Sequence, residues 1–364
     1  MIENKSKTYV IAEAGVNHNG SADIAFKLID AAAHAGADAV KFQTFKTEKL
    51  VTKDAKKANY QIKSTGVSES AFDMLKKLEL EESTFISLAK YAKKLNIGFL
   101  STAFDEDSLS FLTDRLKLTT LKIPSGELTN APLVLAHART KSNIILSTGM
   151  ATLDEIRSAL GVIAYGYIDG DIKSKPTIEK FQEALLLKET KSLLRQKVTI
   201  LHCTTEYPAP LEEINLSALS SIREEFGLEI GYSDHTKGIQ ISPIAVALGA
   251  KIIEKHFTLD INMPGPDHKA SLEPKDLKKM INLIRDVESS MGSGIKKPSI
   301  SELANKNVAR KSIVAETKIQ KGEIFKKENI SIKRPGGGTS PYRYWEFLGK
   351  ISKNDYEIGD MINE

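Results

Sequence analysis

Short apolar segments alternate with longer amphipathic segments along the first four-fifths of the chain. Apolar residues fill consecutive positions of the short segments, which is typical of parallel strands covered by helices on both faces. The strand-like segments lie at 9–17, 39–45, 97–104, 118–125, 143–149, 198–205, 229–236 and 251–258. Helix-like segments lie at about 21–35, 83–95, 106–116, 130–139, 152–165, 216–226, 239–249 and 274–291. Eight strand–helix units in succession predict a (β/α)₈ TIM barrel, with an open doubly wound sheet as the alternative.

Two connections in this pattern are longer than a barrel needs. Residues 46–82 follow the second predicted strand and therefore leave from a carboxyl end, where barrel active sites lie. Long loops in compact domains are often binding loops or lids. We therefore expect residues 46–82 to form a functional loop, whereas residues 166–197, which enter a strand from its amino end, read as a helical insertion on the surface.

The pattern changes after about residue 292. Gly292-Ser293-Gly294 and Lys296-Lys297-Pro298 predict a linker over 292–307, which leaves the barrel at 1–291. Short strands at Ser312–Ala315 and Ile330–Lys333 indicate a separate β-rich domain over 308–364. So small a domain is marginally stable alone, and we expect it to dock on its own barrel or on a partner's.

Composition and charge restrict the class of protein. The 364 residues are 41% hydrophobic and 27% charged, as in globular proteins. The 51 Lys and Arg exceed the 47 Asp and Glu by only four, which is too few for a nucleic-acid-binding face. The lone cysteine, Cys203, excludes an intramolecular disulfide and suits a reducing cytoplasm. No apolar stretch reaches the ~18 residues of a membrane span, so we expect a soluble protein without a membrane partner.

Polar residues stand at the carboxyl ends of all eight predicted strands. These ends converge on one mouth of a barrel, and buried polar groups cost free energy unless they have partners. Convergence of this kind predicts an active site. Its candidate residues are Glu13, Lys41, Gln43, Thr102, Lys122, Ser125, Glu127, Ser147, Tyr207, Ser233, His235, His256 and Asp267.

Two histidines suggest a metal site. His235 and His256 end neighbouring predicted strands, which lie ~4.8 Å apart in a sheet. Two imidazoles with water suit a divalent transition ion such as Mn²⁺, and Zn²⁺ is chemically possible. A pair of hydrogen-bonded structural histidines is the alternative.

Two lysines within strands suggest an anion site. Lys41 and Lys122 stand near the hydroxyls of Thr102, Ser125 and Ser147, and an unpaired buried ammonium is costly. The set favours a phosphate cradle, while a Schiff-base lysine, as in barrel aldolases, is the alternative.

Carboxylates at the predicted mouth complete the candidate chemistry. Glu13 could act as a general acid or base or orient a water, or it could simply pair with a lysine. Glu127 and Asp267 could do similar work or contact sugar hydroxyls. In the tail, Arg334 beside three glycines could be offered to a ligand, or it could lie in an ordinary exposed loop.

The motifs together resemble the N-acetylneuraminate (sialic acid) synthase family, a group that also includes legionaminic and pseudaminic acid synthases. The tail resembles the antifreeze-like (SAF) domain of that family, a β-clip fold. The matching segments are IAEAGVNHNG at 11–20, VKFQTF at 40–45, STAFD at 101–105, LKIPSGEL at 121–128, LSTGMAT at 146–152, LHCTTEYPAP at 201–210, GYSDHT at 231–236, EKHFTLD at 254–260, GPDHKAS at 265–271, VARKSIVA at 308–315 and IKRPGGG at 332–338.

The resemblance implies a specific reaction. The family condenses phosphoenolpyruvate with N-acetylmannosamine and water, giving N-acetylneuraminate and phosphate by C–O cleavage. It uses a divalent metal, usually Mn²⁺, Mg²⁺ or Co²⁺. It also implies a domain-swapped homodimer in which each SAF domain caps the partner's barrel.

Residue by residue, the resemblance assigns roles to the candidates. His235 and His256 match the metal ligands, and Glu13 matches the carboxylate near the attacking water. Glu13, Lys41, Lys122 and His256 are thus the expected catalytic residues. Phosphoenolpyruvate is expected at Lys41, Thr102, Lys122, Ser125 and Ser147. The sugar is expected at Gln43, Glu127, Tyr207, Ser233, Asp267 and a partner chain's Arg334.

The tail motifs favour N-acetylmannosamine as the sugar. A legionaminic acid synthase acting on 2,4-diacetamido-2,4,6-trideoxymannose is the alternative, because the two sugars differ only at C4 and C6. A Schiff-base aldolase is the rival enzyme of the same fold, and a catalytically silent sugar- or surface-binding protein is the rival from another class.

Overall fold

The computed structural model describes residues 7–65, 69–169 and 175–363. The chain divides into two compact units, Met1–Gly292 and Ser293–Glu364.

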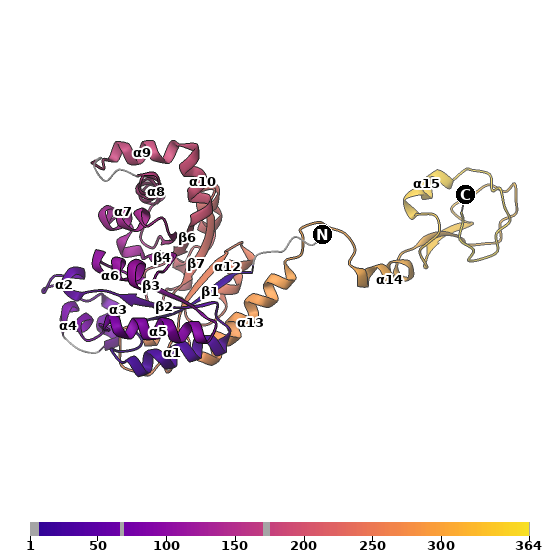
Figure 1. The fold of residues 1–364 in the computed structure, drawn as a ribbon. Helices are drawn as coiled ribbons and strands as arrows, with labels where there is room; N and C mark the ends of the chain where they lie inside the picture. Colours follow the sequence, from indigo (N-terminus) through magenta and orange to yellow (C-terminus); the bar gives the residue numbers. More distant parts are fainter. Residues whose placement is uncertain (1–6, 66–68, 170–174, 364) are drawn as a thin grey trace. The chain divides into compact units, whose positions relative to one another are not determined.

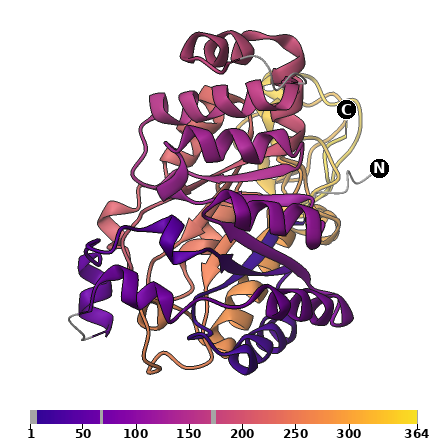
Figure 2. The same cartoon turned by 60° about the vertical axis from the view of Figure 1, so that its left-hand side comes forward.

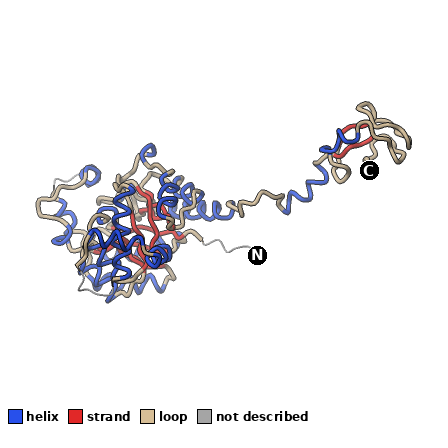
Figure 3. The backbone as a smooth tube through the Cα atoms, turned by 90° about the horizontal axis from the view of Figure 1, so that it is seen from above, coloured by secondary structure: helices blue, strands red, loops and turns tan. Residues whose placement is uncertain are grey.

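The first unit is built on a closed barrel of eight parallel strands in sequential order (Figure 1). Strands β8 and β1 close it, with Glu13 opposite His256. Figure 3 shows the strands at the centre of this unit with helices around them. The (β/α)₈ prediction is therefore confirmed. The strands are β1 Tyr9–Gly15, β2 Ala39–Thr44, β3 Gly98–Ala103, β4 Thr120–Ile123, β5 Asn143–Ser147, β6 Val198–Cys203, β7 Glu229–Asp234 and β8 Ile252–His256.

Helices follow the strands and cover the outside of the barrel (Figure 2). Their ends carry ordinary capping signals. Thr152 and Glu155, for example, form a capping box at the start of α8, in which each side chain bonds the other residue's backbone N–H. The main outer helices are α1 Ala22–Ala35, α5 Glu82–Lys94, α6 Glu106–Ser110 with a π-turn over Phe111–Arg115, α7 Ala131–Arg139, α8 Leu153–Ile168, α11 Ala218–Phe226, α12 Ile241–Ala247 and α13 Pro274–Ser290.

The inside of the barrel changes from apolar to polar along each strand. Ile11, Ala39 and Leu100 belong to a small buried cluster inside the barrel, together with Ile145 and Leu201. Successive side chains of a strand alternate between faces, so the next inward residue lies two positions further on. Those residues are Glu13, Lys41, Thr102, Ser147 and Cys203. A floor of apolar side chains therefore lies directly beneath a polar layer at the carboxyl ends.

The connection over 46–82 folds onto the carboxyl ends of the first strands. It contains α2 Thr47–Leu50, α3 Asn59–Thr65 and α4 Ala71–Lys76. Met74 and Leu78 pack with Val16 and Phe45 in a separate apolar cluster. Gly66 in this connection lies outside the described residues. The packing holds α4 beside the strand ends, where a binding loop was expected.

The insertion over 166–197 is helical, as predicted. It contains the end of α8, α9 Ile178–Leu186 and α10 Lys188–Lys197. Residues 170–174 within it lie outside the described part of the chain.

The second unit pairs β9 Ser312–Ala315 with β10 Ile330–Lys333 in an antiparallel sheet. Its core is small and includes Ile313, Phe325, Phe347 and Ile362. Helix α14 Ile300–Ala309 occupies much of the segment that was expected to be a plain linker; its capping box, Ser299 with Glu302, is the sequence signal for it. A short helix, α15, spans Tyr344–Phe347. None of the helices in the described parts of the two units has the length and apolar content of a membrane span.

Candidate active site

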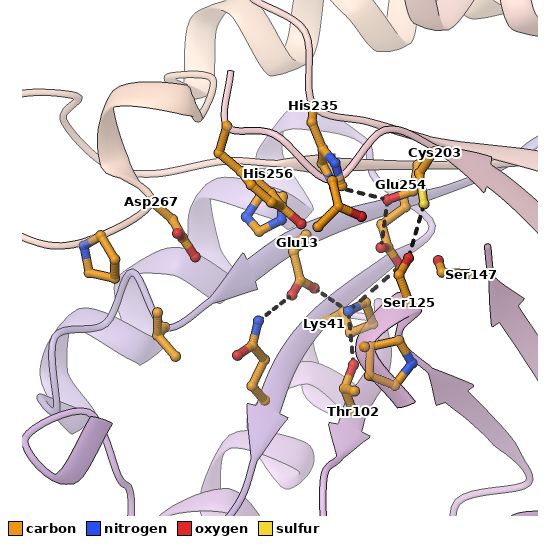
Figure 4. A pocket seen from close by; sticks show the side chains of 18 of the residues that line it. Glu13, Lys41, Thr102, Ser125, Ser147, Cys203, His235, Glu254, His256 and Asp267 are labelled. Atoms are coloured by element: carbon orange, nitrogen blue, oxygen red, sulfur yellow. Dashed lines mark hydrogen bonds and ion pairs between the residues drawn. The ribbon is translucent and has the colours of Figure 1, made fainter. Parts of the chain in front are cut away.

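A cavity of ≈ 210 Å³ opens at the carboxyl ends of the barrel strands (Figure 4). Most of the predicted site residues line it, although they are far apart in the sequence. The predicted lining residues are Glu13, Lys41, Gln43, Thr102, Lys122, Ser125, Ser147, Tyr207, Ser233, His235, His256 and Asp267. The closed barrel is what brings these strand ends to a single mouth.

Two buried lysines in the cavity are each paired with a carboxylate. Lys41 Nζ lies 2.7 Å from Glu13 Oε2 and 3.6 Å from Glu254 Oε2, and it donates to Thr102 Oγ1 at 3.0 Å. Lys122 Nζ donates to Glu254 Oε1 at 2.9 Å. These contacts stabilise the charges, because a buried ammonium needs a partner.

Glu254 is a charged cavity residue that the sequence analysis did not select. It links both lysines and also accepts a hydrogen bond from Ser233 Oγ at 2.9 Å. Burial opposes its ionisation, but Lys122 and Lys41 hold the pKa of Glu254 well below its usual range. The available signal was its position two residues before His256, which puts both side chains on the inner face of β8.

Hydroxyls and a thiol line the side of the cavity formed by β4, β5 and β6. Ser125 Oγ accepts a hydrogen bond from Gly149 N at 2.9 Å and lies 3.2 Å from Cys203 Sγ. The hydroxyl of Ser147 is buried and has no hydrogen-bond partner among the described residues. A buried hydroxyl without a partner is costly, so Ser147 is available to a bound anion.

His235 presents a free lone pair to the cavity. Its Nδ1 lies 2.6 Å from Thr204 O, and a carbonyl oxygen can only accept, so Nδ1 carries the proton. Nε2 lies 3.3 Å from Ser233 Oγ, but the single proton of that hydroxyl is donated to Glu254. The lone pair on His235 Nε2 is therefore left without a donor from this serine.

His256 lies beside His235, with ring centroids 5.4 Å apart. Its Nδ1 is buried and finds no hydrogen-bond partner in the described part of the chain. Burial lowers the pKa of His235 to about 4 and lowers the pKa of His256 well below its usual value. Both rings are thus neutral, which is the state that binds metal.

The residues present fit a divalent ion with two protein ligands. No group of three His, Cys, Asp or Glu is placed to hold a metal within residues 7–65, 69–169 and 175–363. Two neutral imidazoles, one fixed in its tautomer by a backbone carbonyl, are nevertheless the arrangement in which histidine ligands are commonly held. Water or substrate would have to supply the remaining ligands.

The balance of charges in the cavity also favours a bound divalent cation. With all groups ionised, Lys41 and Lys122 are outnumbered by Glu13, Glu254 and Asp267. Burial raises the pKa of Glu13 to about 7 and that of Asp267 to about 6. Glu254 is nevertheless ionised and, with Glu13, pairs with the two lysines of the predicted phosphate cradle, so an anionic substrate would bind best together with a divalent cation.

Aromatic side chains form another part of the wall. The ring of Tyr207 lies 4.1 Å from that of His235 and 4.8 Å from that of Tyr60. Tyr60 and Gln61, both on α3, line the cavity and were not identified from the sequence. Residues 46–82 thus contribute directly to the cavity, as expected of a functional loop.

The motif after β1 holds the loop that carries Asp267. Asn17 Nδ2 donates to Ser271 Oγ at 2.9 Å, and Ser271 Oγ donates to Asp267 O at 2.6 Å. Asn19 Nδ2 donates to Pro264 O at 2.8 Å. These asparagines therefore position the loop from outside the cavity.

One predicted sugar contact, Glu127, is not among the residues that line the cavity. Glu127 ends a 3₁₀ turn whose first residue, Ser125, faces the cavity; its own carboxylate accepts a hydrogen bond from Asn130 Nδ2 at 2.7 Å instead. The position of Glu127 thus gives no support to a substrate contact. Arg334 is exposed in the second unit, so its contact with a barrel stays a prediction.

Comparisons with known proteins show which families the two units resemble. A model of the NeuB family matches residues 28–296, and a model of the SAF domain matches residues 310–364. The chain is 51% identical to the N,N'-diacetyllegionaminic acid synthase of Campylobacter jejuni subsp. jejuni serotype O:2, over 98% of this chain and 99% of the relative. It is 42% identical to the enzyme of the same name from Legionella pneumophila subsp. pneumophila, over 95% and 91%.

A solved structure extends the comparison to the fold. The N-acetylneuraminic acid (sialic acid) synthetase of Leptospira borgpetersenii serovar Hardjo-bovis, in complex with citrate, matches with a TM-score of 0.65 and 32% identity. The match covers 82% of this chain and 90% of that one.

Proposed function

The chain belongs to the NeuB family, and we propose that it condenses phosphoenolpyruvate with 2,4-diacetamido-2,4,6-trideoxymannose and water, releasing N,N'-diacetyllegionaminic acid and phosphate. The observation that carries the choice of sugar is the 51% identity to a legionaminic acid synthase over almost the full length of both chains. Identity to the sialic acid synthetase is 32%. The comparisons thus favour the alternative over N-acetylmannosamine, the sugar that the tail motifs favoured.

The cavity residues suit the chemistry of this reaction. C3 of phosphoenolpyruvate bonds to the aldehyde carbon, water adds at C2, and the C2–O bond to phosphate breaks. Lys41, Lys122 and Ser147 would bind the phosphate and carboxylate groups. A divalent ion held by His235 and His256, with Mn²⁺ favoured over Mg²⁺ or Co²⁺, would polarise the aldehyde as a Lewis acid.

Glu13 is the group proposed to act on the attacking water. It is buried beside Lys41, and Gln43 Nε2 lies 3.4 Å from its Oε1. Because burial raises the pKa of Glu13 to about 7, its carboxylate can accept a proton near neutral pH and return it later. A general base works best when its pKa lies near the operating pH.

The Schiff-base alternative is weaker. An amine nucleophile must lose its proton, and enzymes that use one lower its pKa. Burial alone would lower the pKa of Lys41, but Glu13 and Glu254 together raise it. Lys122 is held by Glu254 at 2.9 Å.

Phosphate release measured with both sugars tests the proposed reaction. We expect turnover of phosphoenolpyruvate with 2,4-diacetamido-2,4,6-trideoxymannose to exceed that with N-acetylmannosamine by at least about tenfold in kcat/KM, and EDTA to abolish it. A site matched to one pattern of polar groups discriminates against a sugar that leaves its own groups unpaired. Preference for N-acetylmannosamine would overturn the choice of sugar, and full activity in EDTA would overturn the metal.

We also propose that the active form is a homodimer in which the second unit of one chain serves the barrel of another. Ile300 on α14 is 91% exposed, and Val308 is 69% exposed. The second unit has a small core, and exposed apolar residues on a small unit support association.

The cytoplasmic location inferred from the lone cysteine stays a prediction.

Mixing two inactive variants tests the proposed exchange. We expect Arg334→Ala and Glu13→Gln each to lose most activity, and unfolding and refolding the two together to restore up to about a quarter of it. In a mixed dimer one barrel then has an intact Glu13 and receives an intact Arg334 from the partner. The activity would be followed by phosphate release, with each variant refolded alone as the control. No recovery in mixed dimers would exclude the exchange.

A further inference from the structure

Neighbouring residues of β7 and β8 point to opposite sides of the barrel wall. Ser233 and His235 line the cavity, as do Glu254 and His256. In the sequence, Asp234 stands between Ser233 and His235, and Lys255 stands between Glu254 and His256. Because side chains alternate along a strand, Asp234 and Lys255 point outward, toward the layer of helices, and both are fully buried there.

Asp234 and Lys255 form a closed ion-pair network outside the cavity. Lys255 Nζ lies 3.1 Å from Asp234 Oδ1 and donates to Thr236 O at 2.6 Å. Asp234 Oδ1 also accepts from Thr236 N at 2.9 Å and from Thr236 Oγ1 at 2.7 Å. Asp234 Oδ2 accepts from Ser242 Oγ, on α12, at 2.7 Å.

The network includes the residues on both sides of His235 in the sequence and the residue just before His256. Asp234 precedes His235 and Thr236 follows it, and the network binds both. Lys255 precedes His256, and it pairs with Asp234 in the register of the two strands. The relative position of the two backbones is therefore fixed one residue before each imidazole.

An ion pair is a costly way to hold two buried strands together. Removing two charges from water can cost more than their attraction returns, and well-packed apolar residues often stabilise such a place better. What charged groups offer in exchange is defined geometry, because each hydrogen bond has a preferred distance and direction. Five polar contacts around one lysine and one aspartate specify that geometry closely.

We infer that Asp234 and Lys255 are positioning residues that set the spacing of His235 and His256 for a shared metal ion. The inference rests on the proposed function, which places the ion between these histidines. Neither residue lines the cavity, so neither would touch the ion or the substrate. Their effect would pass through the backbone of Asp234, His235 and Thr236 and through the start of the turn toward α12.

Mn²⁺ binding to the full-length, metal-free protein tests the inference. The dissociation constant would be measured by the electron paramagnetic resonance signal of free Mn²⁺. We expect Asp234→Asn to raise it by roughly tenfold or more, which is the range found when groups that orient metal ligands are removed. Ser242→Ala keeps both charges and removes one hydrogen bond, so a smaller increase is expected, and this variant gives the readout if Asp234→Asn does not fold.

Asp38→Asn is the matched control. Asp38 also accepts a backbone N–H, from Val10 at 2.9 Å, and pairs with Arg285 at 2.8 Å, but it lies at the amino ends of the strands, away from the cavity. Loss of thermal stability with an unchanged Mn²⁺ dissociation constant is expected for it. The inference is overturned if Asp234→Asn and Ser242→Ala bind Mn²⁺ as the unmodified protein does, or if Asp38→Asn weakens binding equally. Failure of the unmodified protein to bind Mn²⁺ would instead refute the proposed metal site, and the inference with it.

Discussion

Replacing Glu254 with glutamine should disable the enzyme and destabilise its barrel together. Glu254 is the shared partner of Lys41 and Lys122, and all three side chains are almost fully buried. Removing one partner of a buried ion pair costs about 3–5 kcal/mol, because the remaining charge has no compensation. Lys122 would lose its ion-pair partner, and Lys41 would keep only Glu13. We expect a loss of this size in the free energy of unfolding, measured by urea denaturation, and a fall in kcat/KM of at least about 100-fold.

Inorganic phosphate distinguishes this electrostatic reason from a simple packing defect. An anion bound between Lys41 and Lys122 would replace the lost negative charge, so phosphate should raise the melting temperature of Glu254→Gln more than that of the unmodified protein. Glu288→Gln is the control, since Glu288 pairs with Arg285 at the opposite end of the barrel. Unchanged stability and rate in Glu254→Gln would contradict the role assigned to the network.

Replacing His256 with alanine should remove the metal-dependent reaction. In the proposed function, a divalent ion is held by the neutral rings of His256 and His235, which lie side by side. Loss of one of two ligands should abolish measurable Mn²⁺ binding, and the loss of Lewis-acid assistance, worth several kcal/mol, should lower kcat by about 10³-fold or more. Phosphate release with and without added Mn²⁺ measures both effects.

His202→Ala is the matched control for this experiment. His202 also lies on a barrel strand, and burial lowers its pKa as well, but its Nε2 binds the carbonyl oxygen of Ile214 at 2.8 Å. It is not a lining residue of the active-site cavity. Metal-dependent turnover that survives in His256→Ala but not in His202→Ala would reverse the assignment.

Most of the fold could be predicted from the sequence because a (β/α)₈ barrel produces a simple repeated pattern of apolar and polar residues. Each strand is apolar on both faces and is followed by a helix, and the eight repeats can close in few ways. Helix α14 was missed because Gly292, Gly294 and Pro298 just before it indicate a linker. Ile300 and Leu303 of this helix are exposed, so the helix does not bury an apolar face in the core of its own unit.

The sequence predicted most of the residues that line the cavity, but it did not predict how their charges pair. Strand-end position is enough to identify Lys41, Lys122, His235 and His256, because parallel strands bring these ends together. The pairing of both lysines with Glu254 depends on distances across the barrel interior, which a linear pattern does not contain. The same limit applies to Glu127, whose direction is set by a short 3₁₀ turn.

The alternation of Glu254, Lys255 and His256 also affects the register in which β8 pairs with its neighbouring strands during folding. A slip of β8 by one residue against its neighbours would exchange the faces of all its side chains. Lys255 would then enter a cavity that already holds Lys41 and Lys122, while Glu254 and His256 would be turned outward, toward the layer of helices. Such a mispaired barrel would gather three lysines in a cavity whose other carboxylates are Glu13 and Asp267. The alternation of Glu254, Lys255 and His256 thereby favours the native register of the final strand.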